Sequence, residues 1–156
     1  MSEILPIDKL IFEKFLSDVK AKYPLKAFGY FVSASENDYP CEYILFNKDI
    51  RDEMKDEFEA YRDYYVRNDD AGFLATEQEI LNVHRRLHRE GKHIVGVFHS
   101  HQRHPAIFST VDMDLHPSNA LWHMIISLRN YNYPIVKVFK IKNDRVSELQ
   151  MIYREN

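Results

Sequence analysis

The chain has 156 residues, of which 45% are hydrophobic and 29% are charged, and its formal net charge is -3. A chain of this length and composition is expected to fold as one domain around a substantial apolar core. The slight excess of acid excludes the basic face that nucleic-acid binding needs, and it gives no attraction to acidic membranes.

The sequence lacks the patterns of a secreted or membrane-spanning protein. The lone cysteine, Cys41, cannot form an intramolecular disulfide, and it fits a small strand residue better than a nucleophile. The first residues, MSEILPIDKLIFEKF, place acids inside what would have to be the apolar run of a signal peptide. No stretch approaches the roughly 18 apolar residues that a membrane span requires. We therefore expect a cytoplasmic protein without a membrane partner.

The first half of the chain predicts a helix, a hairpin and a charged insertion. Apolar residues recur at helical spacing and stop before Pro24: Ile7, Leu10, Ile11, Phe15 and Val19. Two strands are predicted at 27–34 and 42–47, separated by the turn-prone residues SENDYP. The tyrosine-rich segment at about 51–72 is interpreted either as a surface helix or as an insertion that grips a substrate.

The second half alternates helices and strands. Thr76 and Glu79 form a capping-box pattern that begins a helix, and Gly91 ends it. A buried strand is predicted at 93–101, and a further helix is expected to begin at Ser109. Three more strands follow at 122–128, 135–141 and 146–153, the last two joined by a turn at 143–144. The fold class is therefore mixed α/β, of the α+β kind.

The stretch GVFHSHQRHPAIFSTVDMD, residues 96–114, has the residue types of a catalytic metal site. His99 and His101 alternate on a strand, so both side chains point to the same face. Asp112, in the first turn of the following helix, is near enough to supply a third ligand. Two nitrogens and one carboxylate leave a position for water, and a zinc-bound water becomes an attacking hydroxide near neutral pH. Ser109 can cap the helix and offer its hydroxyl to a developing oxyanion.

Other histidines and other reaction classes fit less well. His84 and His88 have the spacing of a zincin pair, but Arg85 stands where that motif needs glutamate, so we expect surface or packing roles. A zinc nucleobase deaminase needs cysteine ligands that this chain lacks. No G-x-S-x-G elbow supports a serine hydrolase. His104 and His116 remain possible neighbours of the metal ligands.

The pattern H-S-H-x7-S-x2-D, from His99 to Asp112, resembles the signature of the JAMM (MPN+) metalloproteases. Five residues agree in type and spacing, and the order of predicted elements resembles that family over nearly the whole chain. The resemblance implies one domain over residues 1–156, with a curved mixed sheet flanked by helices. The segment at about 51–72 falls where family members carry an insertion that clamps the substrate.

The resemblance also implies an activity and a set of roles. Family members are zinc-dependent hydrolases that cut peptide or isopeptide bonds after the C-terminal tail of ubiquitin or a ubiquitin-like sulfur carrier. On this pattern His99, His101 and Asp112 would bind one zinc ion per chain. Ser109 would help to stabilise the tetrahedral intermediate. The partner would be the tail of a ubiquitin-like or sulfur-carrier protein.

Two positions depart from the family pattern. Many members follow the second histidine with proline, whereas this chain has Gln102 and delays the proline to Pro105. The family also places a glutamate, the general base, shortly before the glycine of the first strand, where this chain has Lys26. A lysine ammonium cannot accept a proton.

Three explanations of Lys26 stay open. In the first, catalysis is lost and the domain only binds zinc or a tail. In the second, another acid, Glu36 or Glu42 of the hairpin, acts as the general base. In the third, burial and the metal charge keep Lys26 neutral. The sequence therefore predicts a zinc hydrolase, with a non-catalytic binding module on the same fold as the competing hypothesis.

Overall fold

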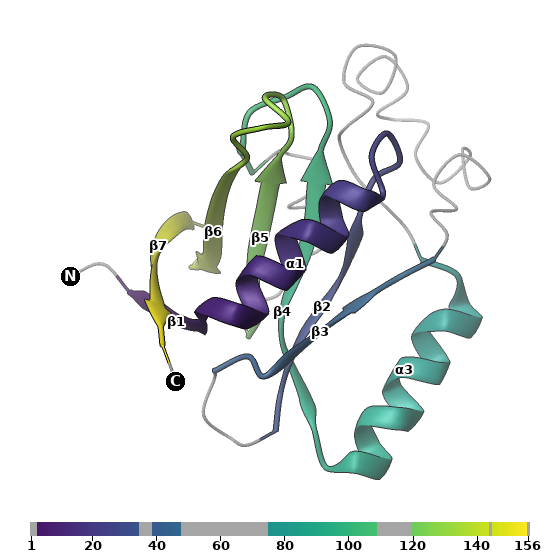
Figure 1. The fold of residues 1–156 in the computed structure, drawn as a ribbon. Coiled ribbons are helices and arrows are strands. Elements are labelled where there is room, and N and C mark those ends of the chain that lie inside the picture. The colour runs from purple at the N-terminus through teal and green to yellow at the C-terminus, as the bar shows by residue number, and fades with distance from the viewer. Residues whose placement is uncertain (1–2, 35–38, 48–74, 109–119, 144, 156) are drawn as a thin grey trace.

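The computed structural model describes residues 3–34, 39–47, 75–108, 120–143 and 145–155. Within these ranges seven strands form one mixed sheet, flanked by two helices (Figure 1). The strand order is β1-β7-β6-β5-β4-β2-β3. The elements are β1 (Ile4–Asp8), α1 (Lys9–Ala21), β2 (Phe28–Ser33), β3 (Glu42–Leu45), α3 (Glu77–Glu90), β4 (His93–His101), β5 (Trp122–Ser127), β6 (Ile135–Lys142) and β7 (Arg145–Arg154). The predicted insertion at 51–72 and the helix predicted to begin at Ser109 fall outside the described residues.

Most predicted elements in the described ranges are confirmed. The β2–β3 hairpin is antiparallel, and β4 covers the predicted 93–101. Thr76 caps α3 by accepting a hydrogen bond from the Glu79 backbone N–H at 3.2 Å, and Gly91 ends the helix with a φ of 67°. The Glu79 carboxylate accepts a hydrogen bond from the Asn47 N–H at 2.8 Å. This bond ties the end of the hairpin to the first turn of α3.

The start of the chain differs from the prediction. Ile7 was expected on the first helix, but it lies in β1, which pairs in parallel with β7. Asp8 explains the change, because its carboxylate accepts a hydrogen bond from the Ile11 N–H at 3.0 Å and caps α1. Leu10, also expected on the apolar face, is 71% exposed. The apolar spacing therefore combined a buried strand residue with a helix that begins two residues later.

Helix α1 covers one face of the sheet, and the main hydrophobic core lies between the two (Figure 1). The ring of Phe15 lies 4.8 Å from the rings of both Phe31 and Phe98, centroid to centroid. Buried side chains of β5, β6 and β7 extend this cluster, among them Trp122, Met124, Ile126, Val138 and Leu149. Burial of such a cluster is the main stabilising term for a domain of this size.

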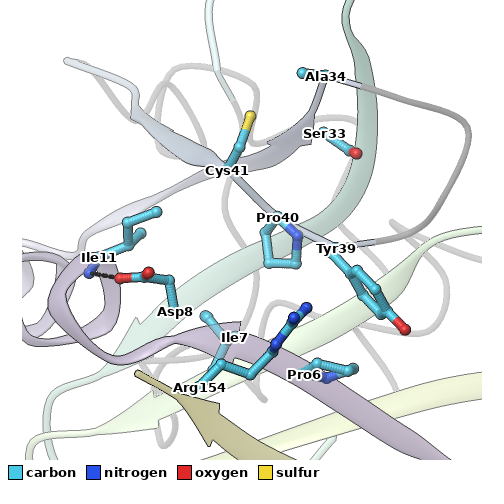
Figure 2. A pocket seen from close by; sticks show the side chains of 10 residues that line it. All are labelled: Pro6, Ile7, Asp8, Ile11, Ser33, Ala34, Tyr39, Pro40, Cys41 and Arg154. Carbon is cyan, nitrogen blue, oxygen red and sulfur yellow. Dashed lines mark hydrogen bonds between the residues drawn. The ribbon is translucent and has the colours of Figure 1, made fainter. Parts of the chain in front are cut away.

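The sheet curls until its two ends approach each other. Residues of β1 and residues before β3 line the same hollow, of about 330 Å³. Figure 2 shows Asp8 and Arg154 on one side of this hollow and Tyr39 and Cys41 on the other. The guanidinium of Arg154 lies 5.3 Å from the Tyr39 ring centroid. Neither described helix has the length and apolar run that a membrane span needs.

The β3 strand is tied to α3 by charge as well as by packing. The Glu42 carboxylate accepts hydrogen bonds from Arg86 at 2.5 Å and from Lys92 at 2.7 Å. Partial burial raises the pKa of Glu42, but the hydrogen bonds and charges of Lys92 and Arg86 outweigh it, and the pKa is lowered. The carboxylate therefore stays ionised in the folded protein.

Gly29 provides a test of how closely the hairpin strands approach. A Cβ atom at this position would lie 1.8 Å from the backbone oxygen of Ile44, which cannot move without breaking the β2–β3 ladder. We expect Gly29→Ala to lower the free energy of unfolding by about 3 kcal/mol, the upper range for overpacking. Urea denaturation measures this change.

Gly91→Ala is the matched control. It places the same methyl group where no atom lies within 4 Å, so only the positive φ opposes it. We expect a loss of about 1 kcal/mol. Equal losses for the two variants would contradict the close approach at Gly29.

The ion pairs of Glu42 predict a pH dependence. Because its pKa is lowered from the ordinary 4.5, its stabilising effect is present above about pH 5 and is lost as the pH falls through the folded-state pKa. Glu42→Gln should therefore lower the free energy of unfolding by about 1 kcal/mol at pH 7 and by less at pH 3. Urea denaturation at both pH values measures the difference.

Glu148→Gln serves as the control for this pH series. Glu148 lies 3.8 Å from Lys137 on the exposed part of the sheet, with 55% of its side chain accessible. We expect this variant to change the free energy of unfolding by less than about 0.5 kcal/mol at either pH. A Glu42→Gln effect that is as large at pH 3 as at pH 7 would mean that shape, not charge, stabilises the hairpin.

Candidate metal centre

Strand β4 places the predicted metal ligands. It lies between β2 and β5, with His99 opposite Phe28 of β2 and Val97 opposite His123 of β5. Phe98 points toward α1 and the main core, so the alternating residues His99 and His101 point to the opposite face. The predicted common face of the two histidines is confirmed.

The two imidazoles meet through their Nε2 atoms. These atoms are 2.9 Å apart, and the ring centroids are 4.8 Å apart. His99 is fully buried and His101 is 4% exposed. The two nitrogens face one another and can bind one divalent ion between them, a common arrangement for zinc.

The loop after β4 fixes the second nitrogen of His101. Its Nδ1 lies 2.8 Å from the backbone oxygen of Pro105. The loop is held to the end of β5, because the Ser127 hydroxyl donates to the His104 oxygen at 2.6 Å and the Leu128 N–H donates to the His101 oxygen at 2.7 Å. A histidine that donates from Nδ1 keeps Nε2 free of hydrogen for a metal.

A third histidine, His123, belongs to the same cluster. Its Nε2 lies 2.8 Å from Nδ1 of His99, and the two rings meet edge to face at 4.9 Å. The ring of Phe108 packs against the His123 ring, with the centroids 5.0 Å apart, and His123 is 4% exposed. Sequence reasoning missed this residue. The available signal was a polar side chain inside the otherwise apolar strand 122–126.

Ser100, between the two predicted ligands, anchors the segment that carries Lys26. The Ala27 N–H donates to the Ser100 hydroxyl at 2.8 Å, and the Ser100 N–H donates to the Ala27 oxygen at 2.8 Å. Lys26 therefore lies directly beside the end of β4. It is partly buried, and alternation along the chain assigns it to the face of Phe28 and His99.

Some predicted residues do not join this cluster. Glu42 pairs with Val32, four residues along β2 from Phe28, which is roughly 13 Å of strand. With its carboxylate held by Arg86 and Lys92, it does not reach the histidines. His104 contributes its backbone oxygen to the loop.

The remaining predicted residues are elsewhere or not described. His84 and His88 are exposed on α3, as expected. The predicted residues Ser109, Asp112, His116 and Glu36 fall outside the described ranges.

The described residues can offer two nitrogens to a metal ion, but they form no complete metal site. Over the described ranges, no group of three or more His, Cys, Asp or Glu side chains is arranged to hold an ion. His123 faces Nδ1 of His99, on the other side of the ring from the Nε2 pair, so it cannot bind the same ion. The donor set fits the nitrogen part of a zinc site whose remaining ligand comes from another segment.

Comparisons with solved structures agree with the fold. A protein of Desulfitobacterium hafniense, solved in solution, is 25% identical, with a TM-score of 0.72 over 97% of this chain and 94% of that one. A JAB1/MPN domain protein from Archaeoglobus fulgidus, known from a crystal structure, is 14% identical, with a TM-score of 0.52 over 95% of this chain and 99% of that one. A protein from Salinibacter ruber, also solved in solution, is 16% identical, with a TM-score of 0.58 over 96% of this chain and 92% of that one.

Sequence comparison gives the family directly. A search of curated proteins found no match. The family model of the prokaryotic homologs of the JAB domain matches residues 10–140, which include the whole histidine cluster and Lys26. The chain belongs to the family of prokaryotic homologs of the JAB domain.

Proposed function

We propose that the protein is a zinc-dependent peptidase or isopeptidase that acts at the C-terminal tail of a ubiquitin-like or sulfur-carrier protein. The observation that carries the proposal is the buried pair of Nε2 atoms of His99 and His101, 2.9 Å apart at the end of β4. Asp112 is proposed as the third ligand, and Ser109 as the group that stabilises the developing oxyanion. When bound, zinc supplies a water acidic enough to attack near neutral pH.

The partner proposal rests on the chemistry of extended tails. A tail that ends in small residues can lie along a strand by backbone hydrogen bonding, with its last residues at the metal. The β3 strand is at one end of the strand order and belongs to the hairpin beside the histidines. The segment at about 51–72 is proposed to clamp the tail from the other side.

The competing proposal is a binding module that has lost catalysis. The residue that favours it is Lys26, which stands beside the end of β4, where the resemblance expects the general base. Because Glu42 is held away by its ion pairs, one of the two acids considered as a substitute base is removed from that role. Lys26 therefore separates the two proposals.

Zinc content tests the metal site. We expect about one zinc per chain in the purified wild type, and loss of most of it in His99→Ala, His101→Ala and Asp112→Ala, because each variant removes one donor. Elemental analysis of chromatographically pure protein measures it.

His84→Ala and His88→Ala are the matched controls for this measurement, since this pair is exposed on α3, away from the cluster. Both variants should keep the zinc content of the wild type. Equal zinc in the wild type and the triple variant of the proposed ligands would contradict the site.

Substitution of Lys26 tests the chemistry. We expect Lys26→Glu to raise the cleavage rate of a fused sulfur-carrier tail by about 100-fold or more, because a carboxylate can accept a proton beside the metal water and an ammonium cannot. Lys14→Glu, on an exposed position of α1, makes the same charge change away from the site and should leave the rate unchanged.

The outcomes distinguish the proposals. If the zinc-loaded wild type cleaves no tail, the binding module is favoured, whether or not Lys26→Glu creates activity. If the wild type is active and both Lys26→Ala and Lys26→Glu lose about 10²–10⁴-fold, the lysine amine itself transfers the proton.

A further inference from the structure

Two loops that are far apart in the sequence form one exposed aromatic surface. The loop between α1 and β2 carries Tyr23 and Leu25, and the turn between β5 and β6 carries Tyr131 and Tyr133. These four residues are between 42% and 76% exposed. The rings of Tyr23 and Tyr131 meet edge to face, with the centroids 5.4 Å apart, so the two loops touch. We call the four residues the tyrosine surface.

The tyrosine surface lies at the same end of the sheet as the candidate metal centre. Figure 1 shows both loops at the end toward which β4 and β5 point. Ser127, from which the β5–β6 turn starts, pairs with His101 at the end of β4. The α1–β2 loop leads to Ala27, whose N–H and oxygen both bind Ser100. A partner that contacts this surface therefore lies beside the proposed metal.

Hydrogen bonds hold both loops in shape without a partner. The Leu25 N–H donates to the Lys22 oxygen at 2.7 Å, and the Tyr133 N–H donates to the Asn130 oxygen at 3.0 Å. The Tyr131 hydroxyl donates to a backbone oxygen of α1 at 3.3 Å, which ties the turn to that helix. A surface that is formed in advance loses little conformational entropy when a partner binds.

The segments at this end of the sheet carry only positive charge. Residues 20–26, 101–107 and 128–135 contain five Lys or Arg and no Asp or Glu. The whole chain has 24 Asp or Glu against 21 Lys or Arg, so this composition is local. A partner with acidic residues around its contact face would complement it.

Three of these cations have no acidic partner among the described residues: Lys20, Lys22 and Arg129. Lys22 donates to a backbone oxygen next to β3 at 2.7 Å, and the Lys20 ammonium lies 5.1 Å from the centroid of the Tyr131 ring. Asp18, the nearest acid along α1, instead accepts a hydrogen bond from a tyrosine of β3. The three cations can therefore form ion pairs with a partner.

We propose that the tyrosine surface binds the folded acceptor protein whose amine is joined to the tail, through an apolar face of that protein with acidic residues around it. The identity of this partner rests on the proposed function. The proposed tail approaches along β3, which lies two strands from β4 on one side, whereas the β5–β6 turn lies on the other side of β4. The acceptor, which lies beyond the metal from the tail, therefore meets this turn.

Single-stranded nucleic acid also binds to tyrosines and cations, but it fits this surface less well. Base stacking needs an open ring face. The Lys20 ammonium lies over the ring of Tyr131, and Tyr23 packs against the same ring. Leu25, which is 72% exposed, has no ring on which a base can stack. Exposed tyrosines with arginine nearby are typical of protein interfaces.

Photo-crosslinking in the source organism identifies the partner. A benzophenone amino acid replaces Leu25 or Tyr133 in the full chain, and it replaces Leu10 as the control, because Leu10 is 71% exposed at the other end of α1. We expect adducts from positions 25 and 133, and none from position 10, with a protein that also carries a tail on a lysine. Its cross-linked peptides should combine apolar and acidic residues.

The other outcomes of this experiment would overturn the proposal. These are adducts with nucleic acid, with the tail-bearing protein, or with a second copy of this chain. Equal adducts from all three positions, or none at all, would overturn it too.

Calorimetry with the purified, tail-free acceptor then measures the contribution of each residue type. Tyr133→Ala and Arg129→Glu should each weaken binding about 10-fold. Leu10→Ala and Lys142→Glu are the matched controls, since Lys142 is exposed at the far end of β6, and both should bind as the wild type does. An acidic residue of the acceptor changed to arginine should restore its binding to Arg129→Glu. Unchanged binding in Tyr133→Ala and Arg129→Glu would contradict the surface, provided that unfolding temperatures show intact folds.

Cleavage kinetics separate this inference from the proposed function. Tyr133→Ala and Arg129→Glu should raise KM about 10-fold for the tail joined to the acceptor, and they should cleave the tail joined to a small dye amine as the wild type does. If these variants match the wild type on both substrates, the docking surface is wrong and the peptidase stands. If the acceptor binds at this surface and neither substrate is cleaved, the peptidase is wrong and the surface stands as that of a binding module.

Discussion

The pairing of β4 with β2 on one side and β5 on the other is the constraint on which the rest of the structure depends. A strand between two neighbours has its alternation fixed, so Phe98 must enter the core under α1 while His99 and His101 face the other way. A shift of one residue in the register of β4 would turn the histidines toward the core and Phe98 away from it. The hydrophobic core therefore aligns the histidine pair, and the same ladder brings His123 beside it.

The sequence predicted the parts of this site that lie on one strand. Alternation along 93–101 was sufficient to put His99 and His101 together, because the period of a strand is independent of its neighbours. It could not reveal His123, since that contact depends on the register between β4 and β5, which are 20 residues apart in the chain and pair in parallel. A local pattern contains no information about such a register.

The predictions at helix ends were likewise correct where the determining contacts are local and wrong where they come from distant parts of the chain. Thr76 and Gly91 were predictable because caps are local hydrogen bonds and local backbone conformations. Ile7 was misplaced because β1 forms only against β7, from the far end of the chain, and its apolar residues happened to match the helical spacing. The Asp8 cap was the local signal for the true start of α1.

The histidine cluster also bears on how the two proposed functions differ. The three rings are buried and in contact through their nitrogens, with His123 Nε2 at 2.8 Å from His99 Nδ1 and the Nε2 atoms of His99 and His101 2.9 Å apart. The presence of His99 and His101 is therefore compatible with either proposed function, because the pair belongs to the buried interior as well as to the candidate metal centre. Lys26 differs, because it is only partly buried, and the Ser100 bonds that position it involve the backbone of Ala27 rather than its own side chain. A substitution of Lys26 leaves these two backbone bonds in place, so it tests the chemistry at this position without removing a hydrogen bond of the β2–β4 ladder.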